Sequence, residues 1–197
     1  DFISMNLTTP YQINKMAGEM YSNYYFHHYN LPVVKCRFFN SFGPGEIPGQ
    51  YRNVIPNFIY WSMTKKTVPI TGTGNETRDF TYVLDLVQGL LKAGYYKQAI
   101  GQSFNLASGK ETKIIQMKNM IDKVLKQKTK INYVNKRKWD TKPRLLASIS
   151  LAKKLIDYRP IYKFEDGLLD NLNWFKENWE KIHNRADFNP GKSSAVK

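Results

Sequence analysis

Cysteine is nearly absent from this sequence, since Cys36 is the only one among 197 residues. A single cysteine excludes an internal disulfide, and its place in the apolar run VVKCRFF favours a small buried side chain over a nucleophile. No apolar run approaches the ~20 residues that span a bilayer, and a signal-peptide pattern is missing at the N-terminus. The three histidines, His27, His28 and His183, lack metal-ligand spacing to cysteines or carboxylates. These absences predict a cytoplasmic protein with no metal site and no membrane partner.

Acidic residues are also scarce, because 16 Asp and Glu stand against 30 Lys and Arg, which gives a net charge of +14. The densest basic stretch lies between Lys123 and Arg144. Such a balance favours an anionic partner, whether nucleic acid, a membrane surface or a phosphorylated metabolite, but it also fits a lysine-rich solvated surface. The lysines are spread over most segments and no common nucleic-acid-binding motif occurs, so we expect no nucleic acid partner.

Hydrophobic periodicity predicts helices and strands that alternate along the chain. Helices are expected from about residue 10 and at about 56–65, 83–96, 112–127, 150–157 and 165–182. Strands are expected at 33–39, 68–71, 78–83, 103–108, 130–134 and 145–150, the first of them buried. This alternation is typical of the α/β class.

The segment TPYQINKMAGE carries a tyrosine and a lysine four residues apart, Tyr11 and Lys15. Thr9, Pro10 and Gln12 form the pattern of a helix start, with an N-cap, a proline in the first turn and a capping-box glutamine. Tyr11 and Lys15 then share one helix face, where an ammonium stabilises a phenolate and favours proton transfer. On these residues alone, the pair also fits an ordinary solvated helix. An apolar stripe on the same helix is expected to face a core: Ile13, Met16, Ala17, Met20 and Tyr24.

The segment GTGNET, at 72–77, resembles the start of a G-x-G-x-x-G dinucleotide fingerprint. The third glycine is missing, and RDFTYV follows as a strand where a helix would be needed to hold a pyrophosphate. We therefore interpret 72–77 as a hairpin turn.

Six motifs occur in one order along the chain: TPYQINKMAGE, RFFNSFGPGE, RNVIPNF, GTGNETRDFTYVLDLV, SFNLASG and RKWDTKPRLLASISLAKKLIDYRP. Together they resemble the extended short-chain dehydrogenase/reductase family, in its NAD-dependent nucleotide-sugar epimerase and dehydratase branch. The resemblance extends from about residue 8 to residue 180.

The resemblance implies roles for residues at matching positions. Tyr11 matches the catalytic base, and Lys15 matches the residue that holds the nicotinamide ribose of NAD. Arg78 and Arg137 match two arginines that clamp the substrate diphosphate, and Asp140 matches an acidic group near the nucleotide ribose. Guanidinium groups suit this task because they bind phosphates bidentately.

Three further positions match the family's nucleotide pocket. Asn40 corresponds to an asparagine near the substrate diphosphate, and Asn53 and Val54 lie in the segment that lines the pocket. A non-binding role is the alternative for three of the matched residues: Asn40 could cap a strand-to-loop turn, Arg78 could be a surface strand residue, and Arg137 could belong to a basic surface run.

The implied fold is α/β, the C-terminal portion of a Rossmann-like doubly wound parallel sheet with a small mixed α/β substrate-binding lobe. Residues 1–39 and 78–110 are assigned largely to the core sheet, 40–77 and 111–183 largely to the lobe, and 184–197 to a disordered tail. In this family the glycine-rich cofactor loop precedes the Tyr–Lys pair. We therefore expect the chain as given to be inactive, to hold NAD poorly and to expose apolar surface beside its sheet.

The implied function is that of a nucleotide-sugar 4-epimerase with NAD, acting on a UDP- or dTDP-linked sugar through a 4-keto intermediate, as a homodimer when complete. A nucleotide-sugar 4,6-dehydratase and a sugar-acid decarboxylase share the oxidation step and stay open as alternatives. A non-catalytic fragment that binds substrate is a further alternative.

Overall fold

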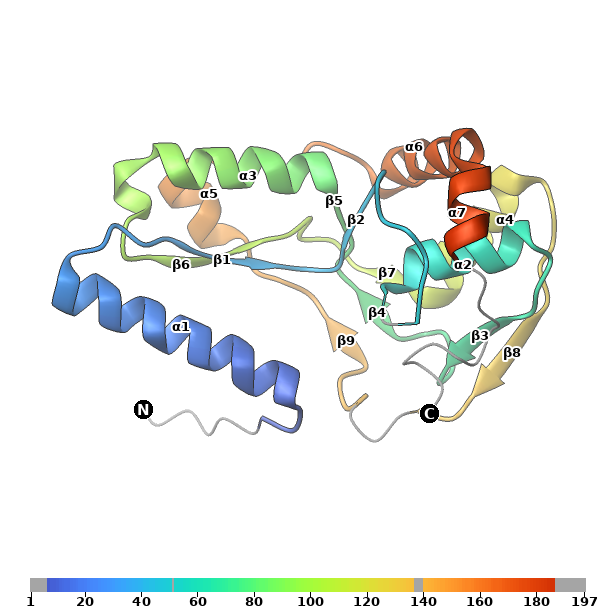
Figure 1. The fold of residues 1–197 in the computed structure, drawn as a ribbon, viewed down its shortest axis with the longest axis horizontal. Helices are drawn as coiled ribbons and strands as arrows, with labels where there is room; N and C mark the ends of the chain where they lie inside the picture. Colours follow the sequence, from blue (N-terminus) through green and yellow to red (C-terminus); the bar gives the residue numbers. More distant parts are fainter. Residues whose placement is uncertain (1–6, 51, 137–139, 187–197) are drawn as a thin grey trace.

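The structure is a computed structural model that describes residues 7–50, 52–136 and 140–186, and it shows an α/β fold (Figure 1). Its helices are α1 (Pro10–Tyr29), α2 (Val54–Met63), α3 (Val83–Tyr95), α4 (Ile114–Leu125), α5 (Ser150–Ile156), α6 (Phe164–Glu177) and α7 (Trp179–Arg185), with a 3-10 turn, η1, at Lys97–Ala99. Its strands are β1 (Lys35–Phe38), β2 (Ser41–Phe42), β3 (Val68–Thr71), β4 (Thr77–Arg78), β5 (Thr81–Tyr82), β6 (Ser103–Leu106), β7 (Thr112–Lys113), β8 (Ile131–Val134) and β9 (Arg144–Leu145). The predicted α/β class is confirmed.

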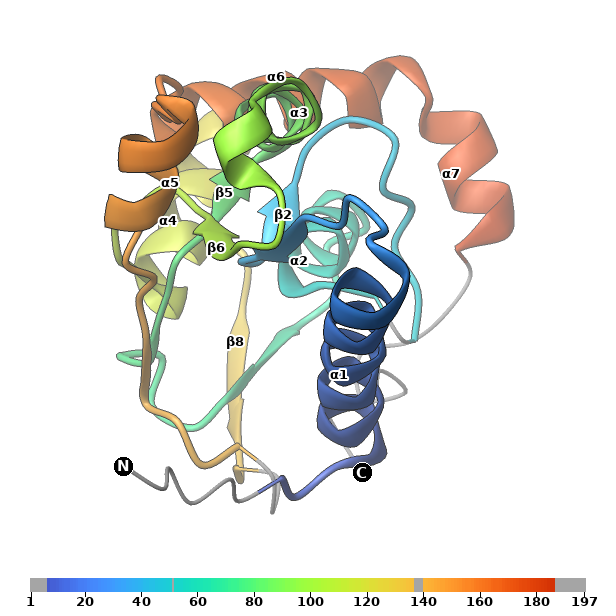
Figure 2. The same ribbon diagram turned by 90° about the vertical axis from the view of Figure 1, so that its left-hand side faces the viewer.

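The described strands pair mostly in parallel. β1 pairs with β6, β2 with β5 and β3 with β8, while β4 lies between antiparallel β7 and parallel β9. Helices α3 and α5 lie on one side of the β1–β6 pair and α1 lies on the other, as both ribbon views show (Figures 1 and 2). Parallel strands with helices on both faces form the layered arrangement expected of a doubly wound sheet.

The buried apolar residues form two clusters. The sheet cluster, under α3 and α5, consists of Leu86, Ala93, Ala99, Phe104, Leu106, Ala107, Ala147, Ile149, Ala152, Ile156 and Tyr158. The lobe cluster consists of Phe42, Ile55, Phe58, Ile59, Tyr60, Trp61, Val68, Ile70, Phe80, Tyr82, Met117, Ile121, Leu168, Leu172, Phe175, Ile182 and Ala186. The lobe cluster holds the largest side chains, so burial there contributes most of the hydrophobic stabilisation.

Helix α1 begins where the sequence predicts. Its N-cap Thr9 accepts a hydrogen bond at Oγ1 from the backbone N–H of Gln12 (3.3 Å), and Pro10 is the first helical residue. The Gln12 side chain accepts from the backbone N–H of Thr8 (2.8 Å) rather than from that of Thr9. The helix ends at Asn30, whose left-handed backbone (φ 53°) is tolerated by asparagine.

The expectation that the apolar stripe of α1 faces a core is wrong among the described residues. Ile13 and Met20 are about half exposed, and no α1 residue is fully buried. The helix instead contacts β1 through polar pairs, which include Lys35 with Asn23 and Arg37 with Glu19. The outer face of α3 also exposes large apolar side chains: Leu84, Val87, Leu90, Leu91 and Tyr95. These two exposed faces belong to helices, so the prediction of exposed apolar surface beside the sheet stays a prediction.

Strand β1 is shorter and more exposed than predicted. It covers Lys35–Phe38, and Phe38 is 52% exposed, so the expectation of a buried strand at 33–39 is wrong. Cys36 is half-buried, and burial raises the pKa of its thiol. Lys35 is buried instead, because its ammonium donates hydrogen bonds to the Asn23 side chain (2.7 Å) and to the Gly101 carbonyl (3.3 Å).

Side-chain hydrogen bonds interrupt three elements that the sequence predicts as continuous. Residues 78–83 form β4 and β5 rather than one strand, since Asp79 between them turns its carboxylate into the core. The predicted helix 165–182 is two helices, α6 and α7, because the Asn178 amide donates to the Trp174 carbonyl (3.0 Å) at the break. The predicted strand 145–150 ends at Leu145, after which the Ala147 N–H donates to Asp79.

Other boundaries also differ from the prediction. Helix α2 begins at Val54, two residues before the expected start, and α4 begins at Ile114, after β7. Helix α7 continues to Arg185, past the predicted start of the tail at 184, and residues 187–197 lie outside the described part. Within the described part, no helix is long and apolar enough to cross a membrane.

The turn at 72–77 is not a hairpin, because β3 pairs with β8 whereas β4 pairs with β7 and β9. Glu76 closes this turn: its carboxylate accepts hydrogen bonds from the backbone N–H groups of Thr73 (3.4 Å) and Gly74 (2.9 Å). Lys136 adds an ion pair at 2.8 Å. Burial raises the pKa of Glu76, but the Lys136 and backbone hydrogen bonds outweigh it and lower the pKa from 4.5 to about 2.

The Glu76→Gln variant is expected to be less stable than the wild type above pH 4.5. Because the folded-state pKa is depressed, the stabilisation is complete above the unfolded value of 4.5 and is lost as pH falls toward about 2. Solvent screens Lys136, so the expected difference in unfolding free energy is roughly 1–2 kcal/mol. Urea denaturation at several pH values, followed by circular dichroism, measures it. A difference that is constant between pH 7 and pH 2.5 would contradict this account.

Candidate functional site

Helix α1 presents the Tyr–Lys pair on its exposed side. The Lys15 ammonium lies over the Tyr11 ring, 5.6 Å from the ring centroid. Tyr11 is 70% exposed, so its hydroxyl is accessible to a ligand. The predicted helix therefore brings these two side chains together on one face, as a cation beside a phenol.

Arg78 lies on β4, the central strand of the β7–β4–β9 sheet. It is half-buried, and its Nη1 donates to the Thr77 carbonyl (2.7 Å). In the strand register Arg78 lies opposite Thr112 of β7 and Leu145 of β9. The strand thus holds the base of this side chain between two neighbouring segments.

Asp79, the residue after Arg78, is fully buried and was not singled out by the sequence. Its carboxylate accepts hydrogen bonds from the backbone N–H groups of Ser108 (2.9 Å), Gly109 (3.0 Å) and Ala147 (3.4 Å), and from the Ser108 hydroxyl (2.6 Å). A buried carboxylate needs such donors to offset its lost hydration. Asp79 therefore joins three segments of the chain directly beside Arg78.

Glu111 and Arg144 form a second connection that the sequence did not reveal. Arg144 donates from Nε and Nη2 to the two Glu111 oxygens (2.6 and 2.8 Å), and the Thr77 hydroxyl donates to the same carboxylate (2.7 Å). The hydrogen bond and charge of Arg144, together with the Thr77 hydrogen bond, hold the pKa of Glu111 below its usual value. Arg144 lies in the motif RKWDTKPRLLASISLAKKLIDYRP, which is the one sequence signal that could have indicated this pair.

Asn40 is also tied to the segment that carries Arg78. Its backbone has a positive φ of 33°, its side-chain amide donates to the Asp79 carbonyl (3.3 Å), and its carbonyl accepts from the Thr81 N–H (3.3 Å). The structure thus places Asn40 against the backbone of Asp79, the residue after Arg78. It also gives Asn40 the structural contact that was the alternative to a ligand role.

Asn53 and Val54 mark the start of α2. Asn53 is exposed, makes no side-chain cap hydrogen bond and donates instead to the Glu46 carboxylate (2.9 Å), while Val54 is half-buried. Burial raises the pKa of Glu46, against the opposing hydrogen bonds from Asn53. These contacts join the loop after β2 to the first turn of α2.

The last two predicted residues precede β9. Asp140 is half-buried and lies four residues before Arg144, whereas Arg137 lies outside the described residues. Because β9 pairs with β4, the segment that carries Asp140 approaches the strand that carries Arg78. Within the described ranges, no group of three or more His, Cys, Asp and Glu residues could hold a metal ion.

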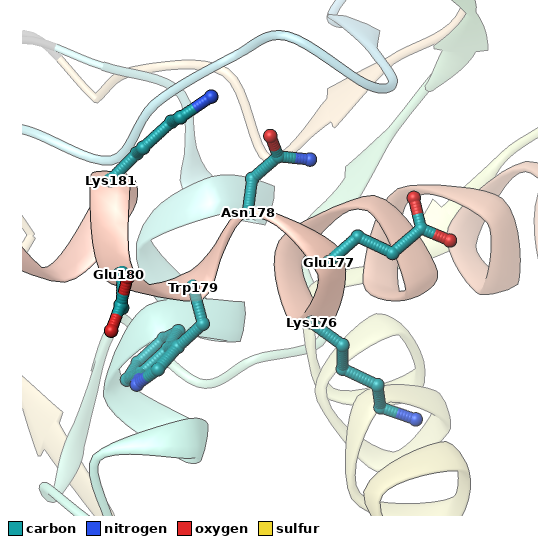
Figure 3. A pocket seen from close by; sticks show the side chains of 6 residues that line it. All are labelled: Lys176, Glu177, Asn178, Trp179, Glu180 and Lys181. Atoms are coloured by element: carbon teal, nitrogen blue, oxygen red, sulfur yellow. The ribbon is translucent and has the colours of Figure 1, made fainter.

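A pocket of about 240 Å³ occurs at the junction of α6 and α7, lined by residues 176–181 (Figure 3). The charged groups around it belong to Lys176, Glu177, Glu180 and Lys181, and Trp179 supplies its ring. The sequence-predicted site residues lie on other elements. This pocket is therefore separate from the predicted site.

These features define a class of protein. A parallel α/β sheet covered on both faces, with a tyrosine and a lysine one turn apart on an adjacent helix, is the arrangement of a short-chain dehydrogenase/reductase. The chain belongs to the NAD-dependent epimerase/dehydratase family, whose family model matches residues 2–107.

Three relatives illustrate this membership. The UDP-glucuronate 4-epimerase of Thermodesulfobacterium geofontis is 35% identical over 175 residues, which are 88% of this chain and 52% of that protein. The structure of epimerase Mth375 from Methanothermobacter thermautotrophicus is 49% identical, with a TM-score of 0.91 over 94% of this chain and 55% of that one. The structure of Bordetella bronchiseptica WbmF in complex with NAD⁺ and UDP is 33% identical, with a TM-score of 0.81 over 93% and 58% of the chains. The chain thus spans about half the length of the relatives it matches.

NAD is the cofactor of this family, and the described residues fit one end of it. The exposed phenol of Tyr11 and ammonium of Lys15 are suited to the hydroxyl groups of a nicotinamide ribose. The turn at 72–77 does not fit a pyrophosphate, because the Glu76 carboxylate already occupies the backbone N–H groups that an anion would need. The interpretation of GTGNET as something other than a dinucleotide fingerprint is consistent with this geometry.

Proposed function

We propose that this chain is part of a nucleotide-sugar 4-epimerase, which oxidises the sugar to a 4-keto intermediate and reduces it on the other face. The observation that carries the proposal is the exposed pair of Tyr11 and Lys15 on α1. The similarity to a UDP-glucuronate 4-epimerase supports the substrate class. NAD, when bound, supplies the hydride chemistry.

The residues of this chain take distinct roles in the proposal. Tyr11 removes the proton from the sugar hydroxyl, and Lys15 binds the nicotinamide ribose and stabilises the phenolate. Arg78 and Arg137 bind the diphosphate through guanidinium groups. Their charge offsets the two phosphate charges of the substrate.

The remaining predicted residues define the nucleotide end of the site. Asn40 lies near the diphosphate, Asn53 and Val54 line the nucleotide pocket, and Asp140 accepts hydrogen bonds from the ribose. The same proposal places the complete protein in the cytoplasm as a homodimer, with neither nucleic acid nor a membrane as partner.

Product analysis tests the reaction directly. The complete protein is incubated with a UDP- or dTDP-linked sugar and NAD, and the product is identified by NMR. An epimer at C4 with no net change in NADH is the expected result. A 4-keto-6-deoxy sugar would identify a dehydratase instead, and release of carbon dioxide would identify a decarboxylase.

Replacing Arg78 with alanine is expected to weaken UDP or dTDP binding. The change removes a charge-assisted contact to the diphosphate, which costs roughly 1.5–3 kcal/mol, or about ten- to a hundredfold in affinity. Isothermal titration at two salt concentrations measures the loss. Arg159→Ala is the matched control, because Arg159 is an exposed arginine of the chain with an ion pair of its own, to Asp157 (2.8 Å).

The control separates a specific site from a basic surface. If affinity came from the net charge alone, both arginine variants would lose little and binding would depend steeply on salt. Unchanged diphosphate binding in Arg78→Ala would remove this residue from the proposed site.

A further inference from the structure

The β7–β4–β9 sheet is built from very short strands. Each of the three strands is two residues long, and β9 is exposed along its whole length. One backbone hydrogen bond, from the Thr77 N–H to the Pro143 carbonyl (2.9 Å), accompanies the pairing of β4 with β9. Such short ladders contain few hydrogen bonds, so side chains must help to fix their position.

Glu111 supplies that side-chain connection. It directly precedes β7, yet its carboxylate reaches both other strands, because it accepts from the Thr77 hydroxyl on β4 and from the guanidinium of Arg144 on β9. The Arg144 contact is bidentate, which fixes direction as well as distance. Glu111 therefore joins all three strands of the sheet.

Arg78 lies between two anchored neighbours. On one side the Thr77 hydroxyl is bound by Glu111, and on the other the Asp79 carboxylate is bound by Ser108, Gly109 and Ala147. The Asp79 connection is buried, whereas the Glu111 connection is solvent-facing. The two connections restrain the backbone on both sides of the arginine.

We propose that Glu111 is a positioning residue for the diphosphate site: through Thr77 and Arg144 it holds β4 so that Arg78 is preorganised, and it holds β9 at a fixed distance from β4. This inference rests on the proposed function, since it assumes that Arg78 binds a diphosphate. Glu111 touches no ligand in this account. Its effect on binding comes from restraining groups that would otherwise have to be ordered when the ligand binds.

The contribution of Glu111 to UDP affinity can be distinguished from its contribution to the stability of the fold. The Arg144 side chain is 65% exposed and the Glu111 side chain is 26% exposed, and ion pairs that water reaches contribute little to global stability. A positioning role therefore predicts weaker diphosphate binding in a protein that still folds normally. A purely structural ion pair predicts no change in binding.

The Glu111→Gln variant is expected to bind UDP about threefold to tenfold more weakly than the wild type, with uridine affinity unchanged. Glutamine keeps an acceptor for Thr77 but loses the ionic, bidentate contact with Arg144. Isothermal titration of the complete protein with UDP and with uridine measures both affinities. Uridine lacks the diphosphate, so it reports damage to the rest of the pocket.

Glu19→Gln is a matched control. Glu19 also forms a bidentate ion pair with an arginine, from Arg37 Nε (2.7 Å) and Nη2 (2.5 Å), but it belongs to α1 and lies outside the β4 region. This variant is expected to leave UDP affinity unchanged. Thermal melts of both variants check that each retains the wild-type fold.

A double-mutant cycle tests whether Glu111 acts through Arg144. Glu111→Gln combined with Arg144→Gln is expected to bind UDP no more weakly than the weaker single variant, because both remove the same contact. If Arg144 bound the diphosphate itself, the Glu111→Gln change would free its guanidinium for the ligand, and the affinity for UDP would stay the same or increase. That result would overturn the positioning role.

The remaining outcomes are distinguishable. If the wild type binds UDP and Arg78→Ala loses affinity while Glu111→Gln matches Glu19→Gln, the positioning role is wrong and the proposed function stands. If Arg78→Ala binds UDP as well as the wild type, the diphosphate site fails and the positioning role fails with it. An equal loss of uridine and UDP affinity in Glu111→Gln would show general damage and would also overturn the proposal.

Discussion

Replacing Tyr11 with phenylalanine is expected to lower the turnover of the complete protein on a nucleotide sugar by about 10²- to 10⁴-fold. The change removes only the ionisable hydroxyl and keeps the ring, so the stacking surface under the Lys15 ammonium is retained. Nucleotide-sugar affinity should therefore stay nearly constant, and the loss should appear in kcat. Steady-state kinetics with NAD and direct binding of the nucleotide sugar measure the two quantities separately.

Tyr21→Phe is the matched control for this prediction. Tyr21 lies on the same helix and is 68% exposed, close to the 70% of Tyr11, so the two changes remove equivalent surface hydroxyls. Turnover should be unchanged in the Tyr21 variant. Near-normal activity of Tyr11→Phe at neutral pH would exclude the tyrosine from the reaction, whatever the control shows.

Lys15 provides an independent check on the same pair. Lys15→Met keeps an unbranched side chain of similar size but removes the ammonium that lies 5.6 Å from the ring centroid of Tyr11. In the proposed function this residue has two tasks, so both turnover and retention of NAD are expected to fall. A variant that loses turnover but keeps NAD would separate the two tasks.

Replacing Asp79 with alanine is expected to cause the largest loss of stability, roughly 3–5 kcal/mol in unfolding free energy. The backbone N–H groups of Gly109 and Ala147 would lose this acceptor, whereas that of Ser108 would keep only its second acceptor, the Thr81 hydroxyl (3.1 Å). Each such group costs more when left without a partner than a hydrogen bond contributes when made. Chemical denaturation followed by far-UV circular dichroism measures the loss.

Ser108→Ala is the graded comparison. It removes only the hydroxyl that donates to Asp79 (2.6 Å), so the expected cost is about 1 kcal/mol. The Asp79→Asn variant should fall between the two, because an amide keeps one acceptor oxygen. Equal stability of Asp79→Ala and Ser108→Ala would mean that the backbone hydrogen bonds to Asp79 contribute nothing.

Local signals were sufficient to predict much of the fold. Thr9 and Pro10 place the start of α1 correctly because the cap is made by residues within one turn. The apolar runs at 68–71 and 103–108 become β3 and β6 for the same reason, since alternation and β-branched content act locally. The α/β class follows from these local features.

The failures have a common cause in contacts between distant segments. The predicted strand 78–83 is interrupted because Asp79 bonds to residues near 108 and 147, which no local pattern indicates. The residues of the candidate site also fall into those that local motifs indicate and those that only distant contacts reveal. Tyr11, Lys15 and Arg78 were found through motifs, whereas Glu111 was missed because its partners Thr77 and Arg144 lie 34 and 33 residues away.

The two buried clusters differ in their optical properties. Three of the four tryptophans, Trp61, Trp174 and Trp179, pack in or against the lobe cluster, while the described members of the sheet cluster include no tryptophan. The fluorescence of these three tryptophans therefore follows the melting of the lobe cluster, whereas circular dichroism follows helices of both clusters. Coincident transitions from the two probes would mean that the two clusters unfold as one cooperative unit. Asp79 connects them, because it directly precedes Phe80 of the lobe cluster and accepts a hydrogen bond from the N–H of Ala147 in the sheet cluster.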